Sequence, residues 1–548
     1  MSFVRAASVR EWWREHPPGR RKSLLIGGSA ALVVAMLGCF FAGASPLLPP
    51  VLLALVFVAL RPVAAMAYVA AVVCVPLGLW LLGIQRLVGD AFGGREYALS
   101  LSASVVACAA LLVTVIRRPP TRAQFLTALA AGALYSVWVV LGVVHNGIPQ
   151  TLVGARLTVV PVILLIVLFG LTGRELRLQV GWTAVLVIAN GVAAIAEYII
   201  GPAKLVEFGF KEDLAIRYIG GTFRAPGLTQ VNAELGLLAG AYLLGYAALW
   251  LVRDLRPREW YWHAAAGAAV VGLALSTSRT GALLLAGGLI AAVVLNRGGG
   301  PAARKRARVV GAVVVVVVVG GFLAIGATGS SSTFERFGVW GRLLRDGAPW
   351  YGAGVGAVGA ATTSRASSSP QVFVDNYFVS ISLQLGIPIL VAVVLLLGWA
   401  VFRLSRGSAT KPQNAVHLAV VCGLAAGCMM IEVWEYADAM FCLALFVAYA
   451  ARVTVPAVTA PEPEPPVPAV PHPRTSPDVA ETVRLQLEPS PADTARLERE
   501  PSPADTVIMK RPATLDDTVI MMNPRPRTPG PRNPSPRQPP ERPERYLR

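Results

Sequence analysis

The sequence predicts an all-α polytopic membrane protein with about fourteen transmembrane helices, a large extracytoplasmic loop and a disordered C-terminal tail. Hydrophobic residues make up 55% of its 548 residues, and charged residues only 15%. The apolar residues form repeated runs close to the length of a membrane-spanning helix. Basic residues gather in alternate short loops, which is the positive-inside pattern. This pattern predicts a protein of the cytoplasmic (inner) membrane with both termini in the cytoplasm.

The chain divides into a basic N-terminal segment (1–23), a membrane domain (24–452) and a tail (453–548). No small-residue cleavage site follows the N-terminal segment at the usual distance, so we interpret the first apolar run as an anchored helix. The long segments 201–231 and 327–375 are expected outside. The expected spans lie near 24–43, 46–60, 62–83, 98–116, 124–144, 151–170, 178–200, 232–251, 261–277, 281–295, 309–326, 376–402, 415–432 and 436–452.

The net charge of +18 does not indicate nucleic-acid binding, because the basic residues follow the alternation of the loops rather than a patch. All six cysteines lie inside apolar runs and lack metal-ligand spacing, so we interpret them as small core residues. The sequence therefore predicts neither a metal site nor a cofactor.

One arginine interrupts two apolar runs in "LALSTSRTGALLLAGG", where Arg279 follows a short polar turn. A charge at the bilayer centre is costly, so we expect this turn at the outer mouth of a helical hairpin. Arg279 then either extends to the membrane interface or binds an anion. Other ionisable residues are expected at the same level: Arg156, Glu197, Arg217, Arg224, Glu234, Glu432, Glu435 and Asp438.

Several arginines at one outer surface suit a polyanion, because the guanidinium stays ionised and binds phosphate oxygens two at a time. Arg156 lies within an apolar run, and Arg224 lies in the loop motif "RAPGLTQVN" that leads to Asn232. Arg217 could equally be a solvated loop charge. Lipid headgroups are a second anionic partner at such a surface.

The second outer segment begins with apolar residues at helical spacing around Arg342, which favours an amphipathic helix lying on the membrane. In "PWYGAGVGAVG", Gly352 and Gly354 would let the backbone approach a ligand and turn N–H groups toward it, although such loops are common. Asp375 precedes the next helix and could be its N-cap or a general base. Asn376 and Tyr377 would then orient a substrate.

Four segments occur in a characteristic order: "RAPGLTQVN", "STSRTG", "RLLRDGAPWYGAGVG" and "DNYFVSISLQLGIP". With this topology, residues 150 to 450 resemble the O-antigen ligase and polymerase superfamily. The resemblance implies a GT-C-type glycosyltransferase. Its donor would be a glycan on a polyprenyl diphosphate, its acceptor another glycan, a lipid or a protein, and its active site on the outer face of the membrane.

The resemblance also implies roles for single residues. Arg224 and Arg279 would hold the donor diphosphate, with Arg156 as a helper and Arg217 as a weaker candidate. Asp375 stands where ligases of this family carry a histidine proposed as catalytic base. This departure fits a polymerase, or a ligase acting on another acceptor, better than a lipid A-type ligase.

Two other classes of function remain open. An exporter or flippase of polysaccharide or lipid-linked sugar would be expected to show inverted repeats and ionisable residues near the midplane. The sequence shows neither. A scaffold that merely anchors the tail would not need several outward-facing arginines.

The tail is rich in proline and charge and contains a repeat with equal spacing. Each copy places a threonine after an acidic residue, with Leu or Met three residues later: Thr482, Thr494, Thr506 and Thr518. Phosphorylation there would suit a forkhead-associated partner domain, which reads phosphothreonine through basic side chains. A low-complexity duplication is the alternative. The Arg/Pro-rich end could rest on anionic lipid of the inner leaflet.

Overall fold

The computed structural model describes residues 18–94, 98–207, 217–219, 222–297, 305, 332–346, 349–364 and 374–453. All of them belong to one of the two compact units of the chain, Met1–Glu464. The basic N-terminus up to residue 17, the expected span 309–326 and the threonine repeat of the tail lie outside the described residues.

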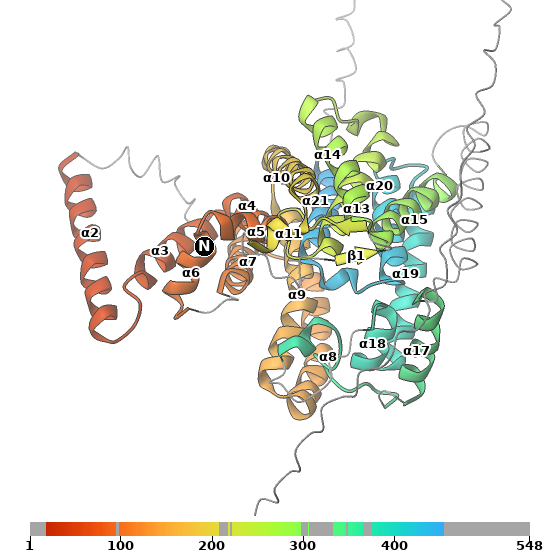
Figure 1. The fold of residues 1–548 in the computed structure, drawn as a ribbon, viewed down its shortest axis with the longest axis horizontal. Coiled ribbons are helices and arrows are strands. Elements are labelled where there is room, and N and C mark those ends of the chain that lie inside the picture. The colour runs from red at the N-terminus through yellow and green to blue at the C-terminus, as the bar shows by residue number, and fades with distance from the viewer. Residues whose placement is uncertain are drawn as a thin grey trace, which may run out of the picture. The chain divides into compact units, whose positions relative to one another are not determined.

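The N-terminal part consists of helices of very different length (Figure 1). They are α2 (Pro18–Phe41), α3 (Leu48–Ala59), α4 (Pro62–Cys74), α5 (Pro76–Leu81), α6 (Ile84–Ala91), α7 (Ala98–Arg117) and α8 (Arg122–Asn146).

The rest of the described chain is a helical bundle with one short hairpin of two strands. Its elements are α9 (Ile148–Gly170), α10 (Gly173–Ile200), α11 (Pro202–Glu207), β1 (Arg217–Ile219), β2 (Thr222–Arg224), α13 (Asn232–Trp250), η1 (Arg253–Leu255), α14 (Trp260–Ser276), α15 (Arg279–Leu295), α17 (Ser332–Asp346), η2 (Gly359–Ser364), α18 (Tyr377–Leu385), α19 (Ile387–Gly407), α20 (Asn414–Cys428), η3 (Val433–Glu435) and α21 (Ala437–Arg452).

Six helices of the described chain are long and apolar enough to cross a membrane: α7, α8, α9, α10, α13 and α19. A seventh span results if α3 and α4, which meet at a bend of 118°, are counted as one. Further apolar helices, such as α15 and α20, are shorter. These features are those of a multi-pass membrane protein. They establish fewer spans than the sequence predicts.

Two of the expected spans are broken. The span 62–83 divides between α4 and α5 at Pro76, which lacks the N–H needed to continue a helix. The span 376–402 divides between α18 and α19 at Gly386, whose φ is +89°. Pro388 follows in the first turn of α19. Apolar length alone predicted continuous helices, whereas proline and glycine chemistry ends them.

Helix α13 occupies the core of the bundle and packs against α14, α15, α20 and α21. Its glycines permit this close packing: a side chain at Gly240 would collide with the backbone of α15, and one at Gly245 with the ring of Phe446. Tyr242 and Phe446 are fully buried and meet edge to face. By contrast, α8 and α19 expose apolar side chains, as expected for helices that face lipid.

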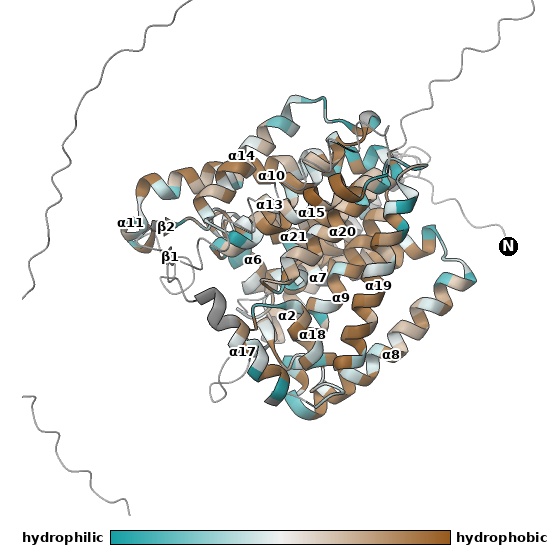
Figure 2. Ribbon diagram, turned by 90° about the vertical axis from the view of Figure 1, so that its right-hand side faces the viewer, coloured by the Kyte–Doolittle hydropathy of each residue, from teal (hydrophilic) through white to brown (hydrophobic). Residues whose placement is uncertain are grey.

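Hydrogen bonds join the helix termini at one end of the bundle. Arg452 Nε donates to the Phe169 carbonyl at 3.1 Å, and Ser405 Oγ donates to the Leu295 carbonyl at 2.7 Å. We call this the basic end, because Arg297, Arg406 and other cations lie there. In Figure 2, hydrophobic colour predominates along the helices and hydrophilic colour gathers near their ends. The candidate site lies at the opposite end.

Candidate functional site

The loop between β2 and α13 is fixed by buried polar side chains of α10. The Glu197 carboxylate accepts from the Gly227 N–H at 2.7 Å, and Asn190 Oδ1 accepts from the Leu228 N–H at 3.0 Å. The loop also pairs with the end of α14, where the Ala225 N–H donates to the Leu275 carbonyl at 3.1 Å. These bonds hold the motif "RAPGLTQVN" against the turn that contains Arg279.

Arg224 is half-buried at this contact. Its Nε donates to the Ser276 carbonyl at 2.9 Å. With its amide oxygen turned toward the guanidinium, Asn232 accepts from Arg224 Nη2 at 2.7 Å. The structure therefore brings together two residues that the sequence placed in the site. It also gives Arg224 a structural role, because the guanidinium satisfies a carbonyl at the C-terminus of α14.

Arg279 lies on the other side of the same turn. Thr277 adopts a left-handed conformation with φ of +47°, and Ser278 caps α15 by accepting from the Gly281 N–H at 3.3 Å. Arg279 is the first residue of α15, and its side chain is exposed. The expected short turn between two helices is confirmed, but α14 and α15 both pack against α13 rather than closely against each other. A cation at a helix N-terminus adds to the positive end of the helix dipole, which makes this turn attractive to an anion.

The other predicted arginines have different surroundings. Arg156 Nη1 donates to Ser100 Oγ of α7 at 3.2 Å. Arg217 is the cross-strand partner of Arg224 in the β1–β2 hairpin. Arg342 is exposed on α17, a helix that the sequence predicted. Among the described residues, no hydrogen bond joins Arg156 or Arg342 to the 276–279 turn, so their grouping with Arg279 stays a prediction.

The interpretation of the glycine-rich loop is wrong in one respect. Gly352 and Gly354 have φ near +90°, but their N–H groups bond within the protein, to the carbonyls of Pro349 and Gln384 at 2.8 and 3.0 Å. A side chain at Gly354 would collide with the backbone of α8, next to Gly142. The glycines therefore allow the loop to pack tightly on neighbouring helices rather than to present N–H groups to a ligand.

The N-cap interpretation of Asp375 is also wrong, because Asn376 is the cap of α18. Its Oδ1 accepts from the Phe378 and Val379 N–H groups at 3.0 and 3.2 Å, and its Nδ2 donates to the Met429 carbonyl at 3.2 Å. Most of the hydrogen-bonding capacity of the Asn376 side chain thus serves the fold, and its expected role in orienting substrate stays a prediction. Asp375 itself is half-buried with φ of +49°.

Two carboxylates that the sequence interpretation had noted but not assigned to the site converge beside Gly359. A Cβ at Gly359 would lie 2.8 Å from Glu435 Oε1 and 3.0 Å from Glu432 Oε1. Glu435 Oε2 accepts from the Ala360 N–H at 3.1 Å, and Ser380 hydrogen-bonds Glu432. Glu432 Oε1 is buried and has no hydrogen-bond partner among the described residues.

Burial raises the pKa of both carboxyl groups, that of Glu432 to about 8 and that of Glu435 to about 7. The neighbouring Glu435 charge raises the pKa of Glu432 further, as does Asp375. Like charges in a dry site disfavour double ionisation, so the pair retains a proton at neutral pH.

The segment around η3 joins the two halves of the predicted site. Trp434 Nε1 donates to the Thr158 carbonyl of α9 at 3.1 Å, and the Trp434 ring stacks on Tyr377. Burial raises the pKa of the neighbouring Tyr436 hydroxyl, and the charges of Glu234, Glu432, Asp438 and Asp375 raise it further. The charges of Glu234, at the start of α13, and of Asp375 thus both act on Tyr436.

We call this assembly the polar cluster. Its members are Arg224, Asn232, Asp375, Glu432 and Glu435, with Arg279 at its rim. The segment "IEVWEYAD" contained a signal for the carboxylate pair. Two acidic residues three positions apart between apolar runs are energetically unfavourable in a membrane protein and therefore indicate a functional site. Among the described residues, no group of three or more His, Cys, Asp or Glu side chains could hold a metal ion.

Comparison with known protein families, with curated proteins and with solved structures finds no match to this chain. The chemistry of the polar cluster is therefore argued from its own geometry. It combines an arginine-lined helix N-terminus, suited to a phosphate-containing anion, with carboxyl groups that can accept or hold a proton.

Proposed function

We propose that the protein is a membrane glycosyltransferase that moves a glycan from a polyprenyl diphosphate carrier to an acceptor glycan, lipid or protein. The observation that carries this proposal is the contact of Arg224 with Asn232 and with the turn that leads to Arg279. Glu234, in the first turn of α13, and Asp375 both act electrostatically on Tyr436 beside η3. We therefore assign a cation for the leaving group and a base for the acceptor to this one region. The order of the four sequence motifs supports the same function.

In the proposed reaction, the acceptor hydroxyl oxygen attacks the anomeric carbon of the donor sugar. The bond from that carbon to the diphosphate oxygen breaks, and its electron pair leaves with the diphosphate. Arg279 and Arg224 stabilise the charge that develops there. Asp375 takes the hydroxyl proton. No nucleotide sugar is needed, because the diphosphate is already a good leaving group.

Glu432 and Glu435 have a separate part in this scheme. Burial raises the pKa of each group, so the pair is not fully ionised at neutral pH. It therefore repels a diphosphate less than two ionised carboxylates would. Ser380 and the Ala360 N–H hold the pair in place next to Gly359. We assign these two residues to positioning and to charge balance.

We propose an arrangement with about fourteen membrane spans, each counted as an apolar segment of ~20 residues. Both termini lie in the cytoplasm in this arrangement. The polar cluster then lies at the outer face of the cytoplasmic membrane, where lipid-linked glycans are polymerised or attached. Deletion of the gene, followed by sizing of the surface glycans, tests the function in the cell. Loss of long chains indicates a polymerase, and long chains left unattached indicate a ligase.

An exporter or flippase is the alternative, and purified protein distinguishes it. A transferase in detergent micelles should lengthen or transfer a glycan supplied on its polyprenyl diphosphate, because the reaction needs no second compartment. An exporter should produce no new covalent product under the same conditions. Product analysis by mass spectrometry, with the Arg279→Ala variant as the inactive control, decides between them.

A further inference from the structure

A buried tryptophan side chain attaches α17 to the bundle. Trp340 is buried, whereas Arg342 on the same helix is exposed. The Trp340 indole Nε1 donates to the Val374 carbonyl at 2.7 Å. α17 and α18 lie side by side (Figure 1), and Trp340 shares a buried hydrophobic cluster with Val379 of α18. Trp340 therefore connects α17 to the residue that directly precedes Asp375.

The same hydrophobic cluster supports the carboxylate pair. Besides Trp340, it contains the buried side chain of Val358. Val358 directly precedes Gly359, beside which Glu432 and Glu435 converge. One apolar core thus lies against two segments that carry or contact acidic members of the polar cluster.

The backbone of Asp375 explains why this support matters. Its φ of +49° is a left-handed conformation that few residues with a side chain adopt, and that persists where the surrounding structure determines it. The Trp340 N–H bonds the carbonyl of the peptide group between Val374 and Asp375, and so fixes the plane of that group. On the other side, Asn376 is fixed as the cap of α18. The direction of the Asp375 side chain is therefore set from both sides.

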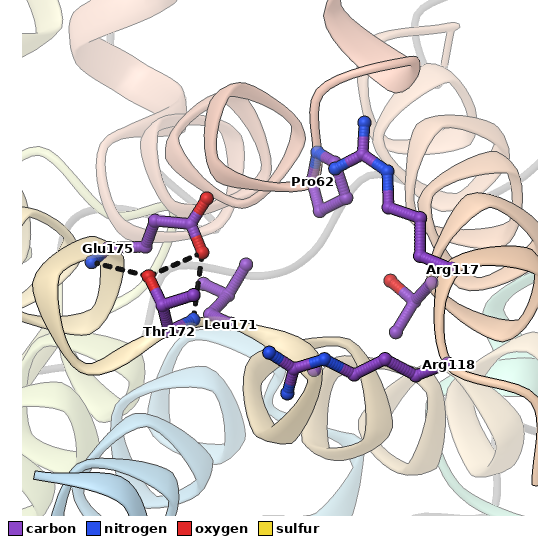
Figure 3. A pocket seen from close by; sticks show the side chains of 8 residues that line it. Pro62, Arg117, Arg118, Leu171, Thr172 and Glu175 are labelled. Atoms are coloured by element: carbon purple, nitrogen blue, oxygen red, sulfur yellow. Dashed lines mark hydrogen bonds between the residues drawn. The ribbon is translucent and has the colours of Figure 1, made fainter. Parts of the chain in front are cut away.

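The start of α10 shows a helix terminus without such a bond. There the Thr172 hydroxyl accepts from the Glu175 N–H at 3.3 Å, and the Glu175 carboxylate accepts from the Thr172 N–H at 2.8 Å (Figure 3). This capping box satisfies helical N–H groups from within one short segment. The Trp340 bond goes instead to a carbonyl that precedes a helix already capped by Asn376. It therefore does not serve to cap α18.

We propose that Trp340 is a positioning residue for Asp375. It holds the Val374–Asp375 peptide group so that the carboxylate keeps one orientation toward the acceptor hydroxyl. This inference rests on the proposed function, in which Asp375 takes the acceptor proton. Without the indole N–H, Asp375 is still present, but its carboxylate is less often in the reactive geometry. The turnover rate kcat should then fall, whereas the KM for the donor should not change, because the arginines bind the donor.

Initial rates of transfer by the purified full-length protein test this inference. The probe donor is a polyprenyl diphosphate-linked oligosaccharide extracted from cells that carry the gene. Trp340→Phe keeps an aromatic ring in the cluster and removes the N–H. We expect kcat to fall roughly 10- to 100-fold, with the donor KM within about twofold of the unmodified value. An unchanged kcat would overturn the proposal.

Trp182→Phe is the matched control, because it removes the same kind of bond far from the polar cluster. Trp182 Nε1 donates to the Ala67 carbonyl at 2.9 Å and thereby joins α10 to α4. This control should retain full activity. A loss in Trp182→Phe as large as that in Trp340→Phe would overturn the proposal, because any lost indole bond would then have the same effect.

A double variant separates positioning from a general loss of structure. If Trp340 acts through Asp375, the protein with both Trp340→Phe and Asp375→Asn should match Asp375→Asn alone within about twofold. A further fall by the whole factor seen in Trp340→Phe would show that Trp340 acts independently of Asp375, and would overturn the proposal.

Hydrogen exchange of the same proteins, measured without donor, tests the physical coupling apart from the reaction. Trp340→Phe should speed amide exchange at residues 374–379 by at least about threefold, and Trp182→Phe should not. Unchanged exchange in Trp340→Phe would overturn the inference. Absence of product from the unmodified protein would instead overturn the proposed function, and the exchange rates would still decide whether Trp340 holds the segment of Asp375.

Discussion

Substitution of Asp375 by asparagine isolates the charge of this residue from its effect on the backbone. Asp375 has φ of +49°, a left-handed conformation that aspartate and asparagine tolerate better than other residues with a side chain. Asn376 supplies the cap of α18, so the change leaves the helix start intact. The Asp375→Asn protein should therefore fold normally while lacking a proton acceptor at this position.

The magnitudes of the two effects differ widely. Alanine at position 375 would have to adopt the left-handed conformation at a cost of about 1–2 kcal/mol, whereas asparagine avoids most of that cost. Loss of a general base, by contrast, slows a reaction by roughly 10²–10⁴-fold. A fall of that size in the Asp375→Asn protein, with unchanged stability, would identify a chemical role.

The assay measures the initial rate of glycan transfer from a polyprenyl diphosphate donor by purified protein in detergent. Asp90→Asn is the matched control, because Asp90 is an exposed aspartate whose ion pair with Arg86 joins two solvent-exposed side chains. We expect this control to retain full activity and stability. Activity of the Asp375→Asn protein within twofold or so of the unmodified protein would refute the role of Asp375 as base.

Three further predictions concern the remaining parts of the site and the topology. Arg279→Ala should abolish transfer while the protein still inserts and folds, and Arg279→Lys should restore little, because lysine lacks the bidentate fork; full activity of the alanine variant would remove the diphosphate assignment. Burial raises the pKa of Glu432 from 4.5 to about 8, so the folded state keeps a proton that the unfolded state loses, and stability should fall as the pH rises through that window. Glu432→Gln should flatten this dependence in thermal unfolding measured at pH 5 and pH 8, and an unchanged slope would contradict the assignment. In a protein without its native cysteines, a cysteine at Gln230 should react with an impermeant reagent added outside intact cells and one at Ala409 should not; the reverse pattern would place the polar cluster in the cytoplasm.

The sequence by itself determined the class of protein and the location of its polar residues. Apolar runs of spanning length predicted the helices, and six to seven of them meet the criteria for a span in the structure. The polar residues before Arg279 predicted a turn between two helices, because a charge is tolerated at the membrane surface and not at its centre, and α14 and α15 are joined by that turn. These features are local, since they depend on residues within one or two helical turns.

Only the tertiary structure decided which residues meet. Asn232 contacts Arg224 because buried Glu197 and Asn190 hold the intervening loop, and neither bond can be predicted from spacing. The convergence of Glu432 and Glu435 on Gly359 joins segments more than seventy residues apart, as the Ala360–Glu435 hydrogen bond shows. The pattern of apolar and polar residues determines which segments lie in the membrane and which polar residues are kept away from lipid. It does not fix which polar partners satisfy one another, because that depends on the packing of distant helices.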